Sequence, residues 1–157
     1  MAENSLITNE LKKMVGMTIG TYIFRVEESI IRRYAEAIGD NNPIFTDAGY
    51  AKKSKRGRLT CPPGFFGWPV SRDYDILALG IALSKAGAPA RVLDGGIDYE
   101  FFEPIGAGDV LTLIQKIIDI AEKETKSGKM LVTTTEVTIL NQDGNIAAKA
   151  RQTAINR

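Results

Sequence analysis

The side chains that could do chemistry gather in one short stretch, Tyr34 to Asp47, which reads YAEAIGDNNPIFTD. The polar residues Asp40 to Asn42 follow an apolar helical pattern, and Pro43 comes directly after them. Three polar side chains are thus held on a constrained connection rather than spread along a solvated helix. A carboxylate at such a place can activate a water molecule. We expect any chemistry of the chain to begin here, at Asp40 and Asn42.

The chain contains no histidine. Histidine is the side chain that most often serves as a general base near neutral pH and is the commonest zinc ligand, so Ser-His-Asp and Cys-His catalysis are excluded within this chain. Cys61 is the only cysteine, which excludes an intramolecular disulfide and a metal site built on thiolates. We therefore expect no metal site, and a reducing cytoplasm is the simplest location.

The length of 157 residues suits one domain, 1–157, with a hydrophobic core of its own. Twenty Lys and Arg residues balance nineteen Asp and Glu residues, so the net charge of +1 gives no reason to expect nucleic acid or an anionic membrane as a partner. The first sixteen residues lack the basic start and apolar centre of a signal peptide, and no run of about 18 apolar residues occurs. We expect a soluble, unprocessed protein.

The front half predicts two helices and one strand. Apolar residues at helical spacing predict helices over 6–14 and 30–38, and β-branched and aromatic residues predict a strand over 21–26. The stretch AKKSKRGR at 51–58 holds five cations, among them Lys53 and Arg56. It is either a solvated loop or a contact for a phosphorylated ligand.

Prolines and glycines interrupt the next stretch, LTCPPGFFGWPV at 59–70, and exclude one long regular helix through it. Its aromatic residues Phe65, Phe66 and Trp68 are too apolar for an ordinary surface loop, so they are either core or the lining of an apolar ligand pocket. Asp75 is suited to be the N-cap of an apolar run over 76–83. That run predicts a buried helix.

The back half changes to the period of two that is typical of strands. We expect strands over 97–101, 110–120, 130–140 and 146–155, with turns at 104–109 and 141–145 and a connection at 123–129. Together these strands predict a four-stranded antiparallel meander. The fold class is therefore α+β, with helices packed against one sheet.

Three segments together resemble the MaoC-like branch of the hot-dog fold: YAEAIGDNNPIF at 34–45, CPPGFF at 61–66 and DYEFFEPIGAGDVLTL at 98–113. The chain looks most like the N-terminal domain of FAS1-type dehydratases. The resemblance implies an antiparallel β-sheet wrapped around a central apolar helix. It spans nearly the whole chain through the order and spacing of these segments.

The family hydrates and dehydrates 2-enoyl thioesters through an Asp and a His in a motif of the form D-x-N-P-I-H. Asp40 and Asn42 match this motif, as do Pro43 and Ile44, but Phe45 replaces the histidine. Phenylalanine can neither accept nor donate a proton, so half of the acid/base pair is missing. The resemblance implies a non-catalytic or half-catalytic protomer that pairs with a catalytic copy.

The resemblance also implies where a ligand would bind. Phe45, Phe65, Phe66 and Trp68 would line an acyl tunnel; the alternative for Phe45 is that it only fills the core of an inactive site. Backbone amides of Gly64, Phe65 or Phe66, just after Pro63, would form an oxyanion hole. Lys53 and Arg56 would meet the phosphates of CoA. No cofactor is expected beyond the acyl thioester itself, carried on CoA or on acyl carrier protein.

Three functions remain open at this point. The first is one subunit of an (R)-specific enoyl-thioester hydratase or 3-hydroxyacyl dehydratase, with a His-bearing MaoC-like partner. The second is a homodimeric acyl-thioester binding protein without turnover. The third is a self-sufficient hydratase or thioesterase that uses Asp40, with Tyr34 or Asn42 as an unusual second group.

Overall fold

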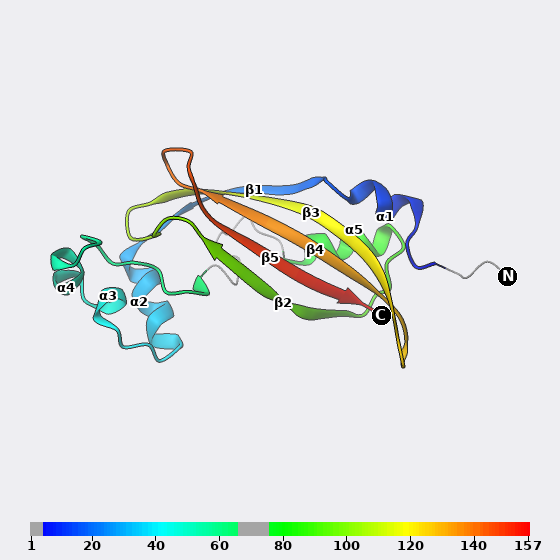
Figure 1. Ribbon diagram of the computed structural model, residues 1–157, viewed down its shortest axis with the longest axis horizontal. Helices are drawn as coiled ribbons and strands as arrows, with labels where there is room; N and C mark the ends of the chain where they lie inside the picture. The colour runs from blue at the N-terminus through cyan, green and yellow to red at the C-terminus, as the bar shows by residue number, and fades with distance from the viewer. Residues whose placement is uncertain (1–4, 66–75) are drawn as a thin grey trace.

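The computed structural model describes residues 5–65 and 76–157 of the chain. Figure 1 shows a curved sheet with helices at one end and behind it. In chain order the described elements are α1 (Asn9–Met14), β1 (Thr18–Arg25), α2 (Glu28–Ala37), α3 (Pro43–Thr46), α4 (Ala48–Lys53), α5 (Ile76–Lys85), β2 (Val92–Phe101), β3 (Val110–Thr125), β4 (Gly128–Leu140) and β5 (Ile146–Asn156).

The five strands form one antiparallel sheet in the order β1-β3-β4-β5-β2. The predicted four-stranded meander is wrong for β2, because only β3, β4 and β5 follow one another as hairpins. The strand β2 pairs with β5 instead, where Phe101 and Tyr99 stand opposite the small residues Ala148 and Ala150. A period of two identifies a strand but does not say which neighbour it pairs with.

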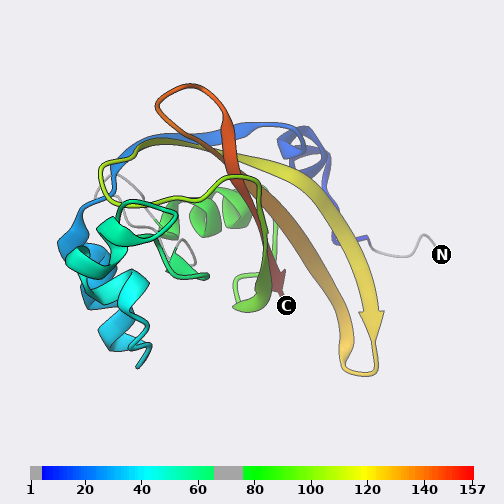
Figure 2. The same cartoon turned by 60° about the vertical axis from the view of Figure 1, so that its left-hand side comes forward.

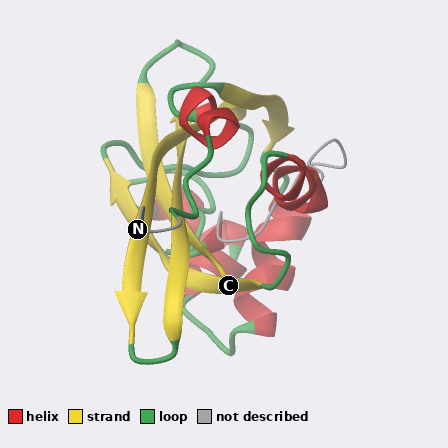
Figure 3. Ribbon diagram, turned by 90° about the vertical axis from the view of Figure 1, so that its right-hand side faces the viewer, coloured by secondary structure: helices red, strands yellow, loops and turns green. Residues whose placement is uncertain are grey.

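The apolar helix α5 lies on the concave side of the sheet (Figure 2), and strands and helices form two layers (Figure 3). Leu83 of α5 is buried in a core cluster with Leu11 of α1 and with Ile117 and Leu131 of the sheet. The expected sheet wrapped around an apolar helix is therefore present. The expectation of burial on all sides is wrong for this single chain, because the side chain of Ile81 is 50% exposed.

A second core cluster lies under α2, at the end of the sheet that carries the polar stretch. Ile31 and Ala35 of α2 are fully buried there. The ring of Phe65 packs edge-on against Tyr34, with 5.4 Å between the ring centroids, and lies 6.2 Å from the ring of Phe24. Gly39 follows α2 with φ of 71°, the left-handed conformation expected of a residue just past a helix end.

Two short helices, α3 and α4, were not expected from the sequence. Asn42 caps α3 by accepting a hydrogen bond from the backbone N–H of Ile44, and Pro43 takes the first helical position. Asp47 caps α4 in the same way through the N–H of Tyr50. The cationic stretch at 51–58 is therefore a loop only from Ser54 onward, since its first three residues belong to α4.

Several strands extend beyond their predicted bounds. The strand β2 already begins at Val92, with an irregularity between Asp94 and Gly96, and β3 runs to Thr125. The predicted connection at 123–129 is thereby reduced to a tight turn before Gly128. The predicted N-cap Asp75 lies outside the described residues. Among the helices of the described residues, none combines the length and apolarity needed to cross a membrane.

Candidate functional site

The polar turn after α2 is held by its own side chains. Asp40 Oδ1 accepts a hydrogen bond from the backbone N–H of Asn42, at 3.0 Å, and Asn42 Oδ1 accepts one from the N–H of Ile44, at 3.1 Å. Asp40 is half-buried and Asn42 is exposed. Within the described part of the chain, no hydrogen bond joins Asp40 to Tyr34. Both motif residues therefore shape the turn, and no hydrogen bond or ion pair among the described residues joins the Asp40 carboxylate to a second acid or base.

Phe45 stands on α3 directly beside this turn. Its half-buried side chain packs against the core cluster under α2, together with Ile44 and Tyr34. The carbonyl of Ile44 accepts a hydrogen bond from the backbone N–H of Thr60, at 3.3 Å, which ties the turn to the following segment. The place of a motif base is thus filled by an apolar ring anchored in the core.

The segment around Pro63 has a mixed role. Phe65 is buried, with 2% of its surface exposed, so it is a core residue in this chain. Its backbone N–H donates to the carbonyl of Pro62, at 3.2 Å, which engages one of the three amides expected in an oxyanion hole. Gly64 has φ of 85°, and a Cβ there would lie 3.0 Å from the hydroxyl of Tyr34. Phe66 and Trp68 lie outside the described residues.

A cavity of about 350 Å³ opens beside this segment. Of the expected ligand-binding residues, Arg56 and Pro63 line it, whereas Lys53 is an exposed residue at the end of α4. The remaining lining residues come from the neighbouring loop and the end of β2: Thr60, Cys61, Phe101, Phe102, Glu103, Pro104 and Ile105. The lining is mixed, with apolar side chains such as Phe101 and Ile105 beside one cation, Arg56, and one acid, Glu103. Such a cavity suits a ligand that has both an apolar part and polar groups.

Two ionisable side chains near this cavity are held in their neutral forms. Burial, with a further contribution from the Asp109 carboxylate, raises the pKa of the Cys61 thiol to about 12. Burial likewise raises the pKa of Tyr99 to about 12, and its buried hydroxyl has no hydrogen-bond partner among the described residues. Neither group is therefore suited to act as a nucleophile near neutral pH, because the reactive form of each is the anion.

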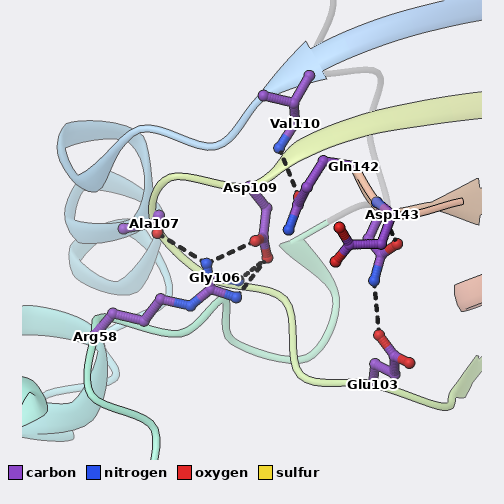
Figure 4. A network of polar contacts seen from close by, with 9 residues as sticks. Arg58, Glu103, Gly106, Ala107, Asp109, Val110, Gln142 and Asp143 are labelled. Carbon is purple, nitrogen blue, oxygen red and sulfur yellow. Dashed lines mark hydrogen bonds and ion pairs between the residues drawn. The ribbon is translucent and has the colours of Figure 1, made fainter. Parts of the chain in front are cut away.

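The strongest polar contact near the site is the ion pair of Arg58 and Asp109 (Figure 4). Two parallel hydrogen bonds of 2.6 and 2.8 Å join the guanidinium to the carboxylate, and Arg58 also donates to the carbonyl of Ala107, at 3.1 Å. The carboxylate accepts a third hydrogen bond from the buried N–H of Gly106, at 3.0 Å. The turn after β2 is thereby fixed against the segment that follows α4.

This ion pair supports both walls of the cavity. Backbone hydrogen bonds join Cys61 to Ile105 and Ala107 to Leu59, at 2.8 and 2.9 Å, so the two walls run side by side. A Cβ on Gly106 would lie 2.4 Å from the carbonyl of Leu59, and only glycine permits this approach. The sequence interpretation counted Arg58 among loop cations and missed its role. The one feature of the sequence that could have indicated this role is the Gly-Asp turn that contains its partner, Asp109.

No cluster of three or more His, Cys, Asp or Glu side chains that could hold a metal occurs among residues 5–65 and 76–157. The site instead offers a carboxylate on a structured turn, an apolar ring beside it and a cavity of mixed lining that includes the side chains of Arg56 and Glu103. Such an arrangement can bind and orient a ligand. Among the described residues of the site, no hydrogen-bonded pair of proton-transferring groups, as hydration of an alkene requires, includes Asp40.

Comparison with known proteins places the chain in a family. The family model of the FAS1-like dehydratase domain region matches residues 13–150. A UPF0336 protein of Parafrankia sp. is 29% identical over 138 residues, which cover 85% of this chain and 85% of that protein. A probable enoyl-CoA hydratase alpha subunit of Thermomonospora curvata is 26% identical over 137 residues, which cover 80% of this chain and 43% of that protein.

A solved structure shows the same fold. The C-terminally truncated HadBC complex of Mycobacterium tuberculosis, a (3R)-hydroxyacyl-ACP dehydratase, contains a chain that superposes with a TM-score of 0.70 at 22% identity. The superposition covers 91% of this chain and 97% of that one. The chain therefore belongs to the FAS1-like dehydratase domain region family and has the hot-dog fold of the MaoC-like hydratases and dehydratases.

Proposed function

We propose that this chain is the non-catalytic protomer of an (R)-specific 2-enoyl-thioester hydratase or 3-hydroxyacyl-thioester dehydratase. It binds the acyl thioester together with a catalytic protomer that carries the intact D-x-N-P-I-H motif. One observation carries the proposal: the motif turn of Asp40 and Asn42 is folded, while Phe45 stands in the histidine position. The frame of the family's active site is retained without its base.

The chemistry explains why this replacement matters. Hydration of the 2,3-double bond requires a base that deprotonates water for attack on the β-carbon, a proton delivered to the α-carbon and donors that stabilise the enolate oxygen. The carboxylate of Asp40 already accepts a hydrogen bond from the turn, and no described acid or base forms a hydrogen bond or ion pair with it. The side chain of Phe45 can instead contribute apolar surface to the acyl group.

A sheet edge that has no partner strand within the described part of the chain supports the pairing with a second protomer. The strand β2 pairs with β5 on one side, and all ten of its residues are exposed or half-exposed. Val92, Ile97 and Phe101 of this strand have 50, 36 and 48% of their surface exposed, and Phe102 directly after it has 52%. An exposed apolar edge strand favours association with another strand. The half-exposed Ile81 of α5 adds to this uncovered apolar surface.

The cavity beside Pro63 supports the binding part of the proposal. The mixed polar and apolar lining suits the pantetheine portion of a thioester, which carries amides on an aliphatic chain, and Arg56 at its wall suits a phosphate of CoA or of acyl carrier protein. Lys53, exposed on α4, adds a positive charge to the same stretch. Residues 101–105 form one wall of this cavity, and they follow directly on the edge strand β2. The catalytic protomer would pair with that strand, so it would lie close to the cavity.

The test is hydration of a short 2-enoyl-CoA by the purified chain, alone and mixed with a MaoC-like protein from the same genome that carries the intact motif. We expect no turnover from the chain alone, and a rate or substrate range in the mixture that the catalytic protein does not show alone. Strong hydratase activity of the isolated chain would refute the proposal. If the mixture has the same rate and substrate range as the catalytic protein alone, the pairing is refuted.

A further inference from the structure

The free edge strand β2 carries negative charge only. Asp94, Asp98 and Glu100 lie within Val92–Phe101, all three are exposed, and the strand contains no Lys or Arg. Register with β5 places Asp98 opposite Arg151 and Glu100 opposite Lys149, so both carboxylates lie on the face of the sheet away from α5. These two acids therefore stand side by side at the open edge.

The cations nearest to these acids along the sheet are engaged elsewhere. Arg151 Nε lies 2.9 Å from Glu136 Oε2, and Lys149 Nζ lies 3.6 Å from Glu136 Oε1, both toward β4 and away from the edge. No ion pair in the described part of the chain includes Asp98 or Glu100. The open edge consequently presents two exposed carboxylates that stand opposite Arg151 and Lys149 but form no ion pair with them, because both cations pair with Glu136.

Pairing of β2 with β2 of a second, identical copy would bring these carboxylates together. We consider antiparallel pairs of two β2 strands that are related by a twofold axis perpendicular to the sheet. If the axis passes through the position of Asp98, the Asp98 side chains of the two copies lie opposite each other. If the axis passes at Tyr99, Asp98 of each copy lies opposite Glu100 of the other copy. With the axis at Ile97, the two Asp98 side chains are diagonal neighbours. Like charges opposite each other destabilise a strand pair, so each of these registers is disfavoured.

We propose that the β2 edge selects a different hot-dog chain, one whose edge strand carries Lys or Arg opposite Asp98 and Glu100. The exposed apolar side chains of β2, such as Ile97 and Phe101, supply contact area on the α5 side of the sheet. The acids on the other face supply the choice of partner, by attraction to a basic strand and by repulsion between identical copies. This inference rests on the proposed function, whose partner it defines.

A charge-reversed copy of this chain is the probe. The variant with Asp98→Lys and Glu100→Lys presents a basic edge of the same shape, so in the register centred at Tyr99 each lysine faces a carboxylate of the wild-type strand. Sedimentation of wild type, variant and a 1:1 mixture at low ionic strength measures the association of each. We expect the mixture to dimerise at least about tenfold more tightly than either chain alone, and less so in high salt.

Two further variants make the result specific. The Glu36→Lys/Asp143→Lys variant has the same change in net charge at exposed positions outside β2, and we expect it to give no such gain when mixed with wild type. The neutral variant Asp98→Asn/Glu100→Gln retains the shape of the edge, and we expect it to self-associate more tightly than wild type. A wild-type chain that dimerises as tightly as the mixture, or that gains nothing from neutralisation, would overturn the inference.

These outcomes are separate from those of the activity test. Sedimentation requires neither substrate nor turnover. A tight wild-type homodimer would therefore refute the selection of the partner by charge, but it would not affect the finding that activity needs an added catalytic subunit. Conversely, hydration by the isolated chain removes the proposed function whatever the sedimentation shows.

Discussion

Removal of the Arg58 guanidinium is the perturbation whose effect follows most directly from the geometry. In the Arg58→Ala variant, Asp109 would lose both hydrogen bonds of the ion pair while its side chain, only 4% exposed, remains buried. Breaking a buried pair by removing one partner costs about 3–5 kcal/mol. We expect the lower end, about 3 kcal/mol, because Asp109 still accepts from Gly106 and the Arg58 side chain was already 38% exposed.

For a chain of this length, about 3 kcal/mol corresponds to a decrease in Tm of about 6–12 °C. The matched control is Arg32→Ala, which removes an Arg–carboxylate contact of 3.0 Å whose two side chains are 45 and 52% exposed. An exposed helical pair of this kind contributes about 0.3–0.5 kcal/mol, so its Tm should change by less than about 2 °C. Arg58→Lys retains the charge but loses the two-pronged contact, and should fall between the two.

The assay is urea unfolding followed by circular dichroism, with Tm from calorimetry as a second readout. If Arg58→Ala is no more destabilising than Arg32→Ala, the ion pair does not hold the two walls of the cavity together and the reasoning fails.

Three further predictions test single features of the site. Because the pKa of Cys61 is about 12 when folded, iodoacetamide at pH 9 should alkylate the native protein about 500-fold more slowly than the urea-unfolded chain. The unfolded thiol loses its proton above about pH 9 while the folded one keeps it, so stability should fall from pH 9 toward 12. Gly106→Ala should destabilise the protein by about 1–3 kcal/mol through its contact with the facing backbone, whereas Gly80→Ala, with open space around its Cβ, should be neutral or stabilising in thermal unfolding. Arg56→Glu should weaken acyl-CoA binding in calorimetry by about tenfold, while Lys85→Glu, at the end of α5, should leave it unchanged.

Local patterns in the sequence were sufficient for most elements. Hydrophobic periodicity with a glycine just past the helix end predicted α2, and alternation with an Asp-Gly turn predicted the β4–β5 hairpin. The helices α3 and α4 were missed although their caps were readable, since Asn42 before Pro43 is a helix start and Asp47 opens the next turn. The stretch was interpreted as a constrained connection without helices because both helices are short, with four and six residues.

Long-range contacts could not be read from the chain. The pairing of β2 with β5 and the ion pair between Arg58 and Asp109 join segments that are about 50 residues apart in sequence, and neither leaves a local pattern. The polar turn with Asp40 and Asn42 was identified from its residues alone, and the resemblance added the family motif that it matches. The structure added that Asp40 caps its own turn and that Phe65 belongs to the core.

The central claim is that this chain contributes binding surface and not proton transfer. Its most direct test is the kcat of the reconstituted complex with Asp40→Asn in this chain, compared with the same substitution in the intact motif of the catalytic subunit. Asparagine still offers an oxygen to the N–H of Asn42, so the turn is retained. We expect kcat to stay within about twofold for Asp40→Asn and to fall about 10²–10⁴-fold for the catalytic subunit. A comparable fall for Asp40→Asn would show that this chain performs chemistry and would contradict the account.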